Sequence, residues 1–494
     1  MRTKKPWRIA LPAMAFCLAG SFAGTGHAED WPQFRGPASS GISRSTRPLP
    51  TELSPTTNVI WKSQIAPGHS SPVISGDRIY LTTATESRLT TVAVNRDTGV
   101  VVWEVDAPFD ELEKIHRTGS RAQSSPVTDG EIVVSFFGSS GLNAYTRDGK
   151  LLWSKRMGPF KNDFGAGSSP IIEGDRVILV QDHDVDSFIA AYDKRTGAEL
   201  WKTDRPEFLR NFATPTIWRV NGQAQIVVPA TLRIVGYNLE NGQEIWTIKG
   251  VSRIVNMTPV IGPDNTLYAA CWSPGNEGDD RVAPLSVDEL FAADADKNGT
   301  IEESEFPEHP LKRRFSQLDR NKDSHLTKAE YESVSRSHAE GRNVVLAIAP
   351  GGTGDITKTH VKWEQTKQIP YCPSPLFFNN QVAMVKDGGI LTVLDAGNGK
   401  VVKQGRLKAT GNYYASPVAG DGKVYLVSQA GELTVLSPEK NWEEIHTAAF
   451  NADGHATPAI ADGRVFVRAG DTLYCFGLPA TQASLSRPAK SPVE

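Results

Sequence analysis

Residues 169–201 read SPIIEGDRVILVQDHDVDSFIAAYDKRTGAELW and contain the unit that decides the fold. A hydroxyl residue and a proline precede an apolar run, and Gly174-Asp175 supplies a turn into a second β-rich run. A further turn follows at Thr196-Gly197, and Trp201 closes the unit near its last strand. Short β-rich runs joined by glycine-containing turns are typical of hairpins, so the unit is predicted to hold four strands.

The hydroxyl–proline pair recurs along the chain with spacings of 54, 44, 45, 44, 116, 42 and 41 residues. Units of about 40 to 50 residues with four strands are typical of a β-propeller, because radial closure leaves only short, protected sheet edges. The sequence therefore predicts an all-β, eight-bladed β-propeller of four-stranded blades rather than a sandwich or a solenoid. The eight pairs are Ser71-Pro72, Ser125-Pro126, Ser169-Pro170, Thr214-Pro215, Thr258-Pro259, Ser374-Pro375, Ser416-Pro417 and Thr457-Pro458.

A tryptophan closes most units near the last strand, where its large ring can cover the contact between neighbouring sheets. The sixth unit carries Val401-Val402 there instead. The eighth unit ends near Leu478 without a fourth strand, whereas residues 59–65 form a β-rich run with no unit of their own. We therefore expect residues 59–65 to complete blade eight and close the ring. The closing tryptophans are Trp103, Trp153, Trp201, Trp246, Trp363 and Trp442.

The N-terminus has the layout of a secretory signal peptide, with four basic residues, an apolar stretch and a small-residue cleavage site ending at Ala28. The apolar stretch, residues 9–23, is shorter than the roughly 20 residues that a transmembrane helix needs. Removal of residues 1–28 and export to the periplasm or the extracellular space are therefore predicted. The remaining chain divides into an N-terminal extension (29–58), a first propeller part (59–271), an insertion (272–342), a second propeller part (343–478) and a C-terminal tail (479–494).

Charge and cysteine content limit the classes of function. Removal of the signal peptide discards four basic residues and no acidic ones, so the formal net charge changes from −3 to −7. This negative balance argues against nucleic acid as a partner. Three cysteines remain after export, Cys271, Cys372 and Cys475, and their spacing does not identify a disulfide pair. The fold must therefore rest on a hydrophobic core.

The long spacing in blade five leaves roughly 70 extra residues, 272–342, and these contain two candidate calcium loops. The first, residues 294–305, reads DADKNGTIEESE and is typical of an EF-hand, in which Ca²⁺ takes six to eight oxygen ligands. Gly299 allows the sharp bend, and Ile301 supplies the apolar position. The predicted ligands are Asp294, Asp296, Asn298, the backbone carbonyl of Thr300, Glu302 directly or through water, and Glu305.

The second candidate loop, residues 319–330, reads DRNKDSHLTKAE, with Ser324 where the first loop has glycine. A side chain in this left-handed bend costs about 1–2 kcal/mol. We therefore expect the second loop to bind Ca²⁺ roughly tenfold more weakly than the first. The imidazole of His325 is expected to point to water while its backbone carbonyl binds the ion. The predicted ligands are Asp319, Asn321, Asp323, His325, Thr327 and Glu330.

The insertion carries most of the negative charge of the mature chain. Residues 272–342 contain 16 acidic and 10 basic residues, a net charge of −6. Two calcium ions would offset most of this charge, so removal of the metal is expected to loosen the module by self-repulsion. A structural role for calcium is favoured over a regulatory one.

Strand direction places the insertion and the axial mouth on one face of the propeller. Strands alternate direction within a blade, so the insertion emerges on the face where each hydroxyl–proline strand begins. One residue, two positions before each pair, is expected at the axial mouth: His69, Gln123, Gly167, Phe212, Asn256, Cys372, Tyr414 and His455.

This mouth is compatible with either a ligand site or a solvated funnel. The candidate ligand residues are His69, Gln123, Asn256, Tyr414, His455, Arg121 and Arg210. The two arginines, with Arg117 and Arg253 close by in the sequence, would favour an anionic ligand. Residues 182–186, DHDVD, are the other compact group of possible metal ligands and are expected to form a wet turn.

The repeated Ser-Pro, Gly-Asp, Thr-Gly and Trp pattern resembles the PQQ-like β-propeller family over roughly residues 59–478, the insertion excepted. Residues 30–37, DWPQFRGP, also resemble the N-terminal signature of exported members. The family includes quinoprotein dehydrogenases and an outer-membrane assembly scaffold, so membership implies the fold more firmly than the activity. The redox members hold the quinone beneath a disulfide between adjacent cysteines and place calcium against it with acidic ligands. This chain has no adjacent cysteines.

Two functional hypotheses follow from these observations. The leading one is a noncatalytic, calcium-binding protein that binds or scaffolds a protein or polymer of the cell envelope. The alternative is a PQQ-dependent oxidoreductase that acts on an alcohol or a sugar at the axial mouth.

Overall fold

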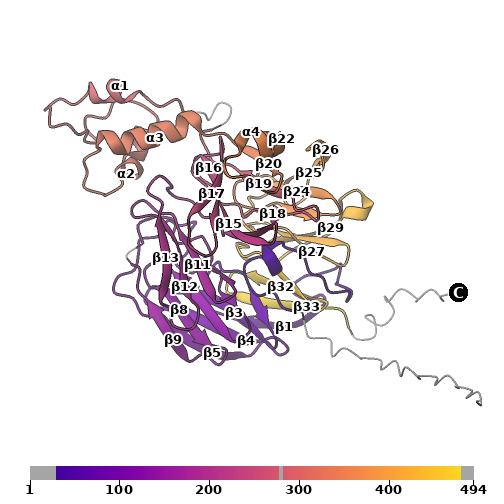
Figure 1. Cartoon of the computed structure of the whole chain (residues 1–494). Helices are drawn as coiled ribbons and strands as arrows, with labels where there is room; N and C mark the ends of the chain where they lie inside the picture. The colour runs from indigo at the N-terminus through magenta and orange to yellow at the C-terminus, as the bar shows by residue number, and fades with distance from the viewer. Residues whose placement is uncertain (1–28, 159, 277–281, 480–494) are drawn as a thin grey trace, which may run out of the picture.

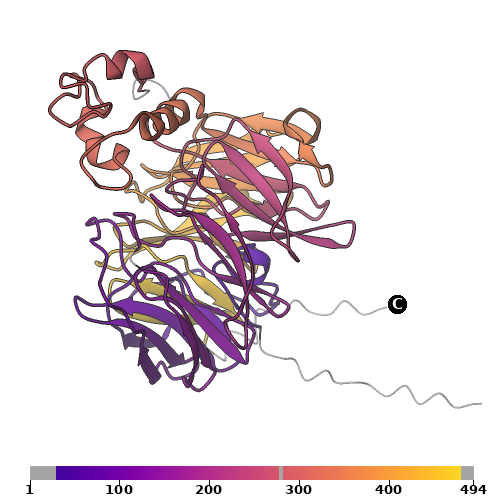
Figure 2. The same ribbon diagram turned by 60° about the vertical axis from the view of Figure 1, so that its left-hand side comes forward.

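The computed structural model describes residues 29–158, 160–276 and 282–479. The predicted signal peptide and residues 480–494 of the predicted tail lie outside the described residues. Eight antiparallel sheets are arranged around a central axis (Figures 1 and 2), and each contains the four strands expected of a blade. The prediction of an eight-bladed β-propeller is therefore confirmed.

Each blade is built from strands in simple up-and-down order. Blades one to four are β2 (Val73–Ser75), β3 (Arg78–Ala84), β4 (Leu89–Asn95) and β5 (Val101–Asp106); β6 (Val127–Thr128), β7 (Ile132–Phe137), β8 (Gly141–Thr146) and β9 (Leu151–Lys155); β10 (Ile171–Glu173), β11 (Arg176–Gln181), β12 (Phe188–Asp193) and β13 (Glu199–Asp204); β14 (Thr216–Val220), β15 (Gln223–Ala230), β16 (Arg233–Asn238) and β17 (Glu244–Lys249).

The remaining blades continue this order around the axis. They are β18 (Val260–Ile261), β19 (Leu267–Cys271), β20 (Val344–Ile348) and β22 (Val361–Gln365); β23 (Leu376–Phe378), β24 (Gln381–Lys386), β25 (Ile390–Asp395) and β26 (Val401–Arg406); β27 (Val418–Gly420), β28 (Lys423–Val427), β29 (Glu432–Ser437) and β30 (Glu443–Ala449); and β31 (Ala459–Ala461), β32 (Arg464–Ala469), β33 (Thr472–Gly477) and β1 (Val59–Gln64). The short strand β21 (Gly354–Asp355) adds a parallel fifth strand to blade four, and α4 (Thr357–His360) follows it.

Ring closure uses the N-terminal strand. β1 pairs antiparallel with β33, and the register joins Trp61 to Cys475 and Gln64 to Thr472. The last blade therefore combines three strands from the end of the chain with one from its beginning, as the unassigned run at residues 59–65 predicted. This pairing covers the sheet edge that an open ring would expose.

The core lies between the faces of neighbouring blades. All six residues of β7 are buried, whereas β5 and β13 alternate between half-buried and exposed residues. The inner strands are thus covered on both faces, and the fourth strand of each blade forms the rim. Continuous Val, Ile and Ala runs in the inner strands suit this environment, because there is no solvated face to alternate with.

A tryptophan on the outer strand of one blade contacts the next blade at five of the interfaces. Its ring packs against the glycine of the next blade's second hairpin turn, for example Trp103 on Gly149, where φ is +85°. Its indole N–H also donates to a backbone carbonyl of that blade, from Trp103 to Arg147 at 2.9 Å. The repeated Thr-Gly or Asn-Gly turn and the repeated Trp therefore form one contact across the blade interface. The tryptophans that make this contact are Trp61, Trp103, Trp153, Trp201 and Trp363.

Two tryptophans depart from this arrangement. Trp246 donates instead to Gln225 of its own blade at 2.7 Å, and Trp218 makes the contact to the next blade through Asn265. Trp442 precedes β30 and donates to Gln381 of blade six at 2.6 Å. Trp442 thus lies next to the last strand of its unit, as predicted, but contacts the preceding blade rather than the following one. Its ring covers the preceding interface, where blade six carries valines in place of tryptophan.

The hydroxyl of each Ser-Pro or Thr-Pro pair links neighbouring blades around the axis. The backbone N–H of one pair donates to the side-chain oxygen of the next blade's pair, and seven such bonds of 2.9–3.0 Å are present. The last runs from Thr457 back to Ser71 and closes the series. Among the described residues, the Thr258 hydroxyl has no hydrogen-bond partner, and the series is interrupted between blades four and five. The repeat therefore places a hydroxyl where it satisfies a buried backbone donor.

The N-terminal extension occupies the axis. Trp31 exchanges two backbone hydrogen bonds of 2.8 Å with Ile74 in blade one. The fully buried guanidinium of Arg35 donates to the carbonyl of Pro375 in blade six at 2.7 Å. The extension thus spans the ring from one side to the other, and Figure 1 shows this indigo segment among the blades. Phe34 lies in the wall of the cavity described below.

The insertion forms a small helical module beside the propeller (Figure 1). It contains α1 (Val287–Phe291), the 3₁₀ turn η3 (Lys312–Arg314), α2 (Phe315–Leu318) and α3 (Lys328–Glu340). Ser286 and Thr327 cap α1 and α3, each in a reciprocal pair with the glutamate three residues later. The module has its own apolar core, formed by Leu290, Ile301, Phe306, Leu311, Phe315, Leu318, Leu326 and Tyr331.

Candidate functional site

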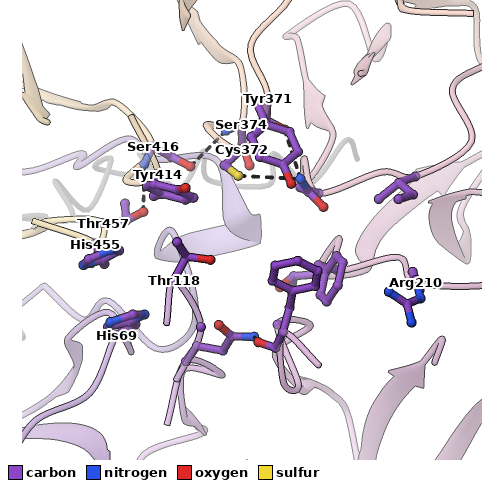
Figure 3. A pocket seen from close by; sticks show the side chains of 18 of the residues that line it. His69, Thr118, Arg210, Tyr371, Cys372, Ser374, Tyr414, Ser416, His455 and Thr457 are labelled. Atoms are coloured by element: carbon purple, nitrogen blue, oxygen red, sulfur yellow. Dashed lines mark hydrogen bonds between the residues drawn. The ribbon is translucent and has the colours of Figure 1, made fainter. Parts of the chain in front are cut away.

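A cavity of about 390 Å³ lies at the axial mouth, on the face that carries the insertion. Its wall contains the residue two positions before the hydroxyl–proline pair of every blade, and Figure 3 shows several of these side chains directed into the space. Arg210 also lines the cavity, but Arg121 does not; its Nε donates to the Glu113 carbonyl at 3.0 Å. The sequence-based placement of Arg121 at the mouth is therefore wrong. The blade residues in the wall are His69, Gln123, Gly167, Phe212, Asn256, Cys372, Tyr414 and His455.

The ionisable groups on one side of this axial pocket are neutral. The rings of His69 and His455 stack with centroids 3.9 Å apart. Burial, together with the nearby His455 and Arg468, lowers the pKa of His69 to about 3. Burial also lowers the pKa of His455 and raises the pKa of the Cys372 thiol, which accepts a 3.6 Å contact from Asn256. At neutral pH this side offers uncharged imidazoles and a protonated thiol, which is a poor nucleophile.

The opposite side of the axial pocket is basic. Arg210, Arg253 and Arg314 all line it, and no aspartate or glutamate does so among the described residues. All three cysteines of the described chain are free thiols. A calcium ion held against a quinone needs acidic ligands. The residues in the wall therefore do not fit the calcium–quinone arrangement that the family resemblance implies.

The sequence pattern does not predict several residues of the cavity wall. Phe34 comes from the N-terminal extension, Tyr371 adjoins a residue that was identified, and Arg314 and Gln317 come from the insertion. The hydroxyl–proline repeat cannot predict the positions of residues that lie outside it. Only the packing of the insertion against the propeller brings Arg314 to the cavity.

The loop at residues 182–186 is not the wet turn that its composition suggested. Asp182 and Asp184 are each only 2% exposed. Asp182 accepts two hydrogen bonds of 2.8 Å from the buried Arg205, and Asp184 accepts two of 2.6 Å from Arg210. These carboxylates are paired because burial of an isolated charge is strongly unfavourable. The loop is therefore a structural element rather than a free group of metal ligands.

The same loop anchors the inserted module. Arg320, at the second position of the second candidate calcium loop, donates from Nε to the Asp184 carbonyl and from Nη2 to the Pro206 carbonyl, both at 3.2 Å. The guanidinium of Arg210 engages the side chain of the same Asp184. Asp184 thus joins the module, the axial pocket and blade three through adjacent hydrogen bonds.

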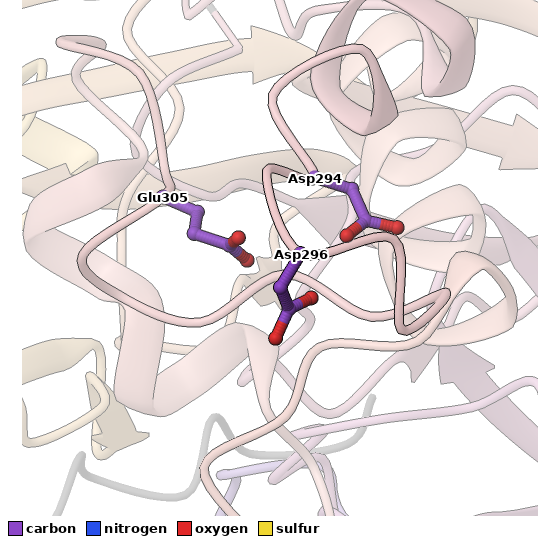
Figure 4. Close-up of side chains that lie close together, drawn as sticks. All are labelled: Asp294, Asp296 and Glu305. Carbon is purple, nitrogen blue, oxygen red and sulfur yellow. The ribbon is translucent and has the colours of Figure 1, made fainter.

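Carboxylates converge in the first candidate calcium loop. One oxygen from each of Asp294, Asp296 and Glu305 lies within 4.8 Å of the others (Figure 4). Asp294 accepts from the backbone N–H groups of Asn298 and Gly299 at 3.2 and 3.0 Å, which fixes its orientation. Gly299 has φ of +86° and supplies the predicted bend.

The other three predicted ligands of this loop contact one another. The Thr300 hydroxyl donates to the Asn298 side-chain oxygen at 2.6 Å and to Glu302 at 3.2 Å. The Asn298 amide also donates to Glu302 at 3.0 Å. The side chains of Asn298, Thr300 and Glu302 therefore lie side by side in this loop.

The second candidate loop has a similar backbone. Asp319 accepts from Lys322 and Ser324 N–H groups at 2.8 and 2.9 Å, and Ser324 has φ of +69°, the left-handed bend predicted for it. Asn321 donates to Asp323 at 2.8 Å. The loop ends where the Thr327 hydroxyl donates to Glu330 at 2.7 Å.

The two loops are joined into a pair. Ile301 and Leu326 exchange backbone hydrogen bonds of 3.0 and 2.9 Å in a short antiparallel bridge. The imidazole Nδ1 of His325 lies 2.7 Å from a Glu302 carboxylate oxygen of the first loop. The imidazole is half exposed, but it also contacts Glu302 instead of facing water alone, because the bridge brings position seven of one loop beside position nine of the other.

Comparison with known proteins identifies the class of protein. A family model described as outer membrane protein assembly factor BamB matches residues 42–163, 92–273 and 387–478. Because these ranges cover more than half of the chain, the protein belongs to this family of PQQ-like repeat propellers. No curated protein sequence matches the chain.

Similar solved structures share the fold. BamB from Moraxella catarrhalis is 13% identical, with a TM-score of 0.52 over 85% of this chain and 99% of that chain. The computationally designed Ika8 protein is 12% identical, with a TM-score of 0.51 over 85% of this chain and all of the other. A europium-containing methanol dehydrogenase is 9% identical, with a TM-score of 0.49 over 91% and 98% of the two chains. The likeness to the first two structures is one of fold alone. Among the described residues, no helix is long and apolar enough to cross a membrane.

Proposed function

We propose that this protein is an exported, calcium-binding propeller that binds or scaffolds a component of the cell envelope without catalysing a reaction. The observation that carries the proposal is the composition of the axial pocket. Its described wall contains neutral histidines, a protonated thiol and arginines, and no carboxylate among the described residues. A wall of this kind can hold a ligand but offers neither a general base near neutral pH nor acidic ligands for a catalytic metal. The envelope role is supported by the family's description as an outer membrane assembly factor and by the signal-peptide layout of residues 1–28.

The outer strands provide a surface for an envelope partner. Aliphatic side chains in these strands or directly before them are 41–63% exposed on four consecutive blades, eight, one, two and three. Exposed apolar side chains on sheet edges favour the addition of an extended strand from another protein. We propose that such a strand, from an envelope protein, binds this arc. The residues of the arc are Ile60, Val100, Val102, Leu151, Leu152 and Leu200.

The partner can be captured from the envelope fraction of the source. We expect wild-type protein to retain a specific envelope protein and the triple variant Val102→Asp/Leu152→Asp/Leu200→Asp to lose it. Val401→Asp/Val402→Asp is the matched control, because both valines are equally exposed on blade six. Equal capture by all three proteins would rule out the arc as the docking surface.

The quinone alternative is tested separately with purified protein, PQQ and calcium. We expect no alcohol-dependent reduction of a dye. A one-to-one quinone spectrum together with dye reduction would replace the scaffold proposal with the oxidoreductase.

We propose further that the paired loops bind Ca²⁺, with the first loop the tighter site. The chain supplies only oxygen ligands at the predicted positions, as a hard cation requires. The close approach of Asp294, Asp296 and Glu305 supports this assignment for the first loop. The strained Ser324 supports weaker binding in the second.

Glu305→Gln is expected to abolish the tighter of two calcium-binding events in calorimetry and to leave the weaker one. The substitution removes the charge and one ligand oxygen of the bidentate carboxylate at position twelve. Glu303→Gln is the control, because Glu303 is exposed in the same loop and is not a predicted ligand. An unchanged tighter event in Glu305→Gln would refute the ligand assignment.

A further inference from the structure

The axial pocket continues into the seam between the propeller and the inserted module. A crevice of about 60 Å³ lies along this seam, and it shares Arg210, Arg253, Arg314 and Gln317 with the axial pocket. Arg253 comes from the connection between β17 and β18, and Arg314 ends η3 of the module. The module therefore completes one wall of the pocket rather than standing apart from it.

Two of the shared arginines lack an acidic partner. Arg210 is neutralised by Asp184 through two hydrogen bonds of 2.6 Å. The half-buried Arg253 donates only to the neutral carbonyl of Pro274, at 3.2 and 3.0 Å, and Arg314 makes no side-chain hydrogen bond or ion pair with any described residue. Burial and the neighbouring Arg314 lower the pKa of Arg253 to about 10, which reflects the absence of a counter-charge. Two unpaired guanidinium groups at one seam are unfavourable unless an anion neutralises them.

An apolar surface adjoins these guanidinium groups. Phe212 and Phe164 line the same cavity with ring centroids 6.5 Å apart, and Tyr371 lies in the wall near Arg253. Flat rings and planar guanidinium groups together suit a ligand with an anionic end and an aromatic body. The cavity volume of about 390 Å³ matches a small molecule rather than a folded partner.

We propose that the seam binds a small aromatic anion, with its carboxylate or phosphate group between Arg253 and Arg314 and its ring on Phe212. The inference deepens the proposed binding function, on which it rests, and assigns a role to the module that the propeller family does not supply. Since Arg314 belongs to the module, the ligand bridges two parts of the chain.

The proposal is tested by calorimetry on the full mature chain in excess calcium. Phenyl phosphate and benzoate serve as anionic probes, inorganic phosphate as a free anion, and benzyl alcohol as the neutral match. We expect phenyl phosphate to bind at least tenfold more tightly than benzyl alcohol and more tightly than inorganic phosphate. Arg314→Gln is expected to lower the affinity for phenyl phosphate at least tenfold, because charge-assisted hydrogen bonds to the anion are lost.

Control variants show whether the affinity for phenyl phosphate depends on the guanidinium group of Arg314 itself or only on the net charge. Arg313→Gln removes an equal charge from the adjacent, exposed residue and is expected to bind phenyl phosphate as wild type does. Arg314→Lys keeps the positive charge but lacks the planar guanidinium group with its paired donors. We expect its loss of affinity for phenyl phosphate to be smaller than that of Arg314→Gln. Melting temperatures of all variants show whether each is folded.

Two results would overturn the proposal. One is equal affinity for phenyl phosphate and benzyl alcohol in the wild-type chain. The other is wild-type affinity in a folded Arg314→Gln. Either result leaves the capture of an envelope partner and the quinone titration unaffected, so failure here is distinguishable from failure of the proposed function.

Discussion

Replacement of residues 59–65 by a glycine–serine segment of equal length is expected to remove more than about 5 kcal/mol of stability. The replacement keeps the N-terminal extension attached but removes β1 from blade eight. Trp61 and Ile65 are 8% and 5% exposed, and loss of a buried tryptophan alone costs about 3–5 kcal/mol. The ladder between β1 and β33 and the indole hydrogen bond from Trp61 to Arg96 are lost as well. Thermal unfolding followed by circular dichroism should show a melting temperature at least about 5 °C lower.

A substitution in the same strand provides the control. Ile60 is 45% exposed on the outer side of β1, so Ile60→Ser should change stability by no more than about 0.5 kcal/mol. If the glycine–serine replacement melts at the wild-type temperature, β1 does not contribute to closing the ring.

Asp182→Asn is expected to lower the free energy of unfolding by about 3–5 kcal/mol. The side chains of Asp182 and Arg205 are 0% and 1% exposed, and Arg205 also lies over the ring of Phe208 at 4.1 Å. Asparagine has nearly the same shape but leaves the guanidinium of Arg205 buried without a counter-charge. Urea denaturation of the calcium-loaded protein measures the loss.

Two further variants test the physical cause of this loss. Glu364→Gln breaks an exposed pair, in which Arg342 lies 2.8 Å from Glu364, and should cost no more than about 1 kcal/mol. Asp182→Asn/Arg205→Met removes both charges and should recover part of the stability, because an apolar pair tolerates burial. Equal losses of unfolding free energy in Asp182→Asn and Glu364→Gln would show that burial does not strengthen the ion pair between Asp182 and Arg205.

The repeat predicted the architecture because each repeated residue has a repeated physical role. The hydroxyl before each proline satisfies a backbone donor of the neighbouring blade, so its spacing counts the blades. The position two residues earlier has the same geometry in every blade, and it lies in the cavity wall each time. Local loop patterns were equally informative, since Gly299 and Ser324 both have the left-handed backbone expected from their positions.

The differences from the prediction lie where contacts between distant segments override local pattern. Trp442 contacts the preceding blade, where blade six carries valines in place of tryptophan, rather than the following one. The charged loop at residues 182–186 is buried because Arg205 and Arg210, more than 20 residues away in sequence, neutralise it. Arg314 reaches the axial pocket only through the packing of the module on blade three. Such contacts depend on the tertiary structure, and no repeated pattern in the sequence indicates them.

The N-terminal extension has a kinetic consequence for anything that enters the axial pocket. Phe34 forms part of the pocket wall, and the extension crosses the axis behind it between blades one and six. A molecule moving along the axis would have to displace this extension, so exchange through the module's side of the propeller is favoured. A partner resting over the module's side of the propeller would lengthen the residence time of whatever lies inside.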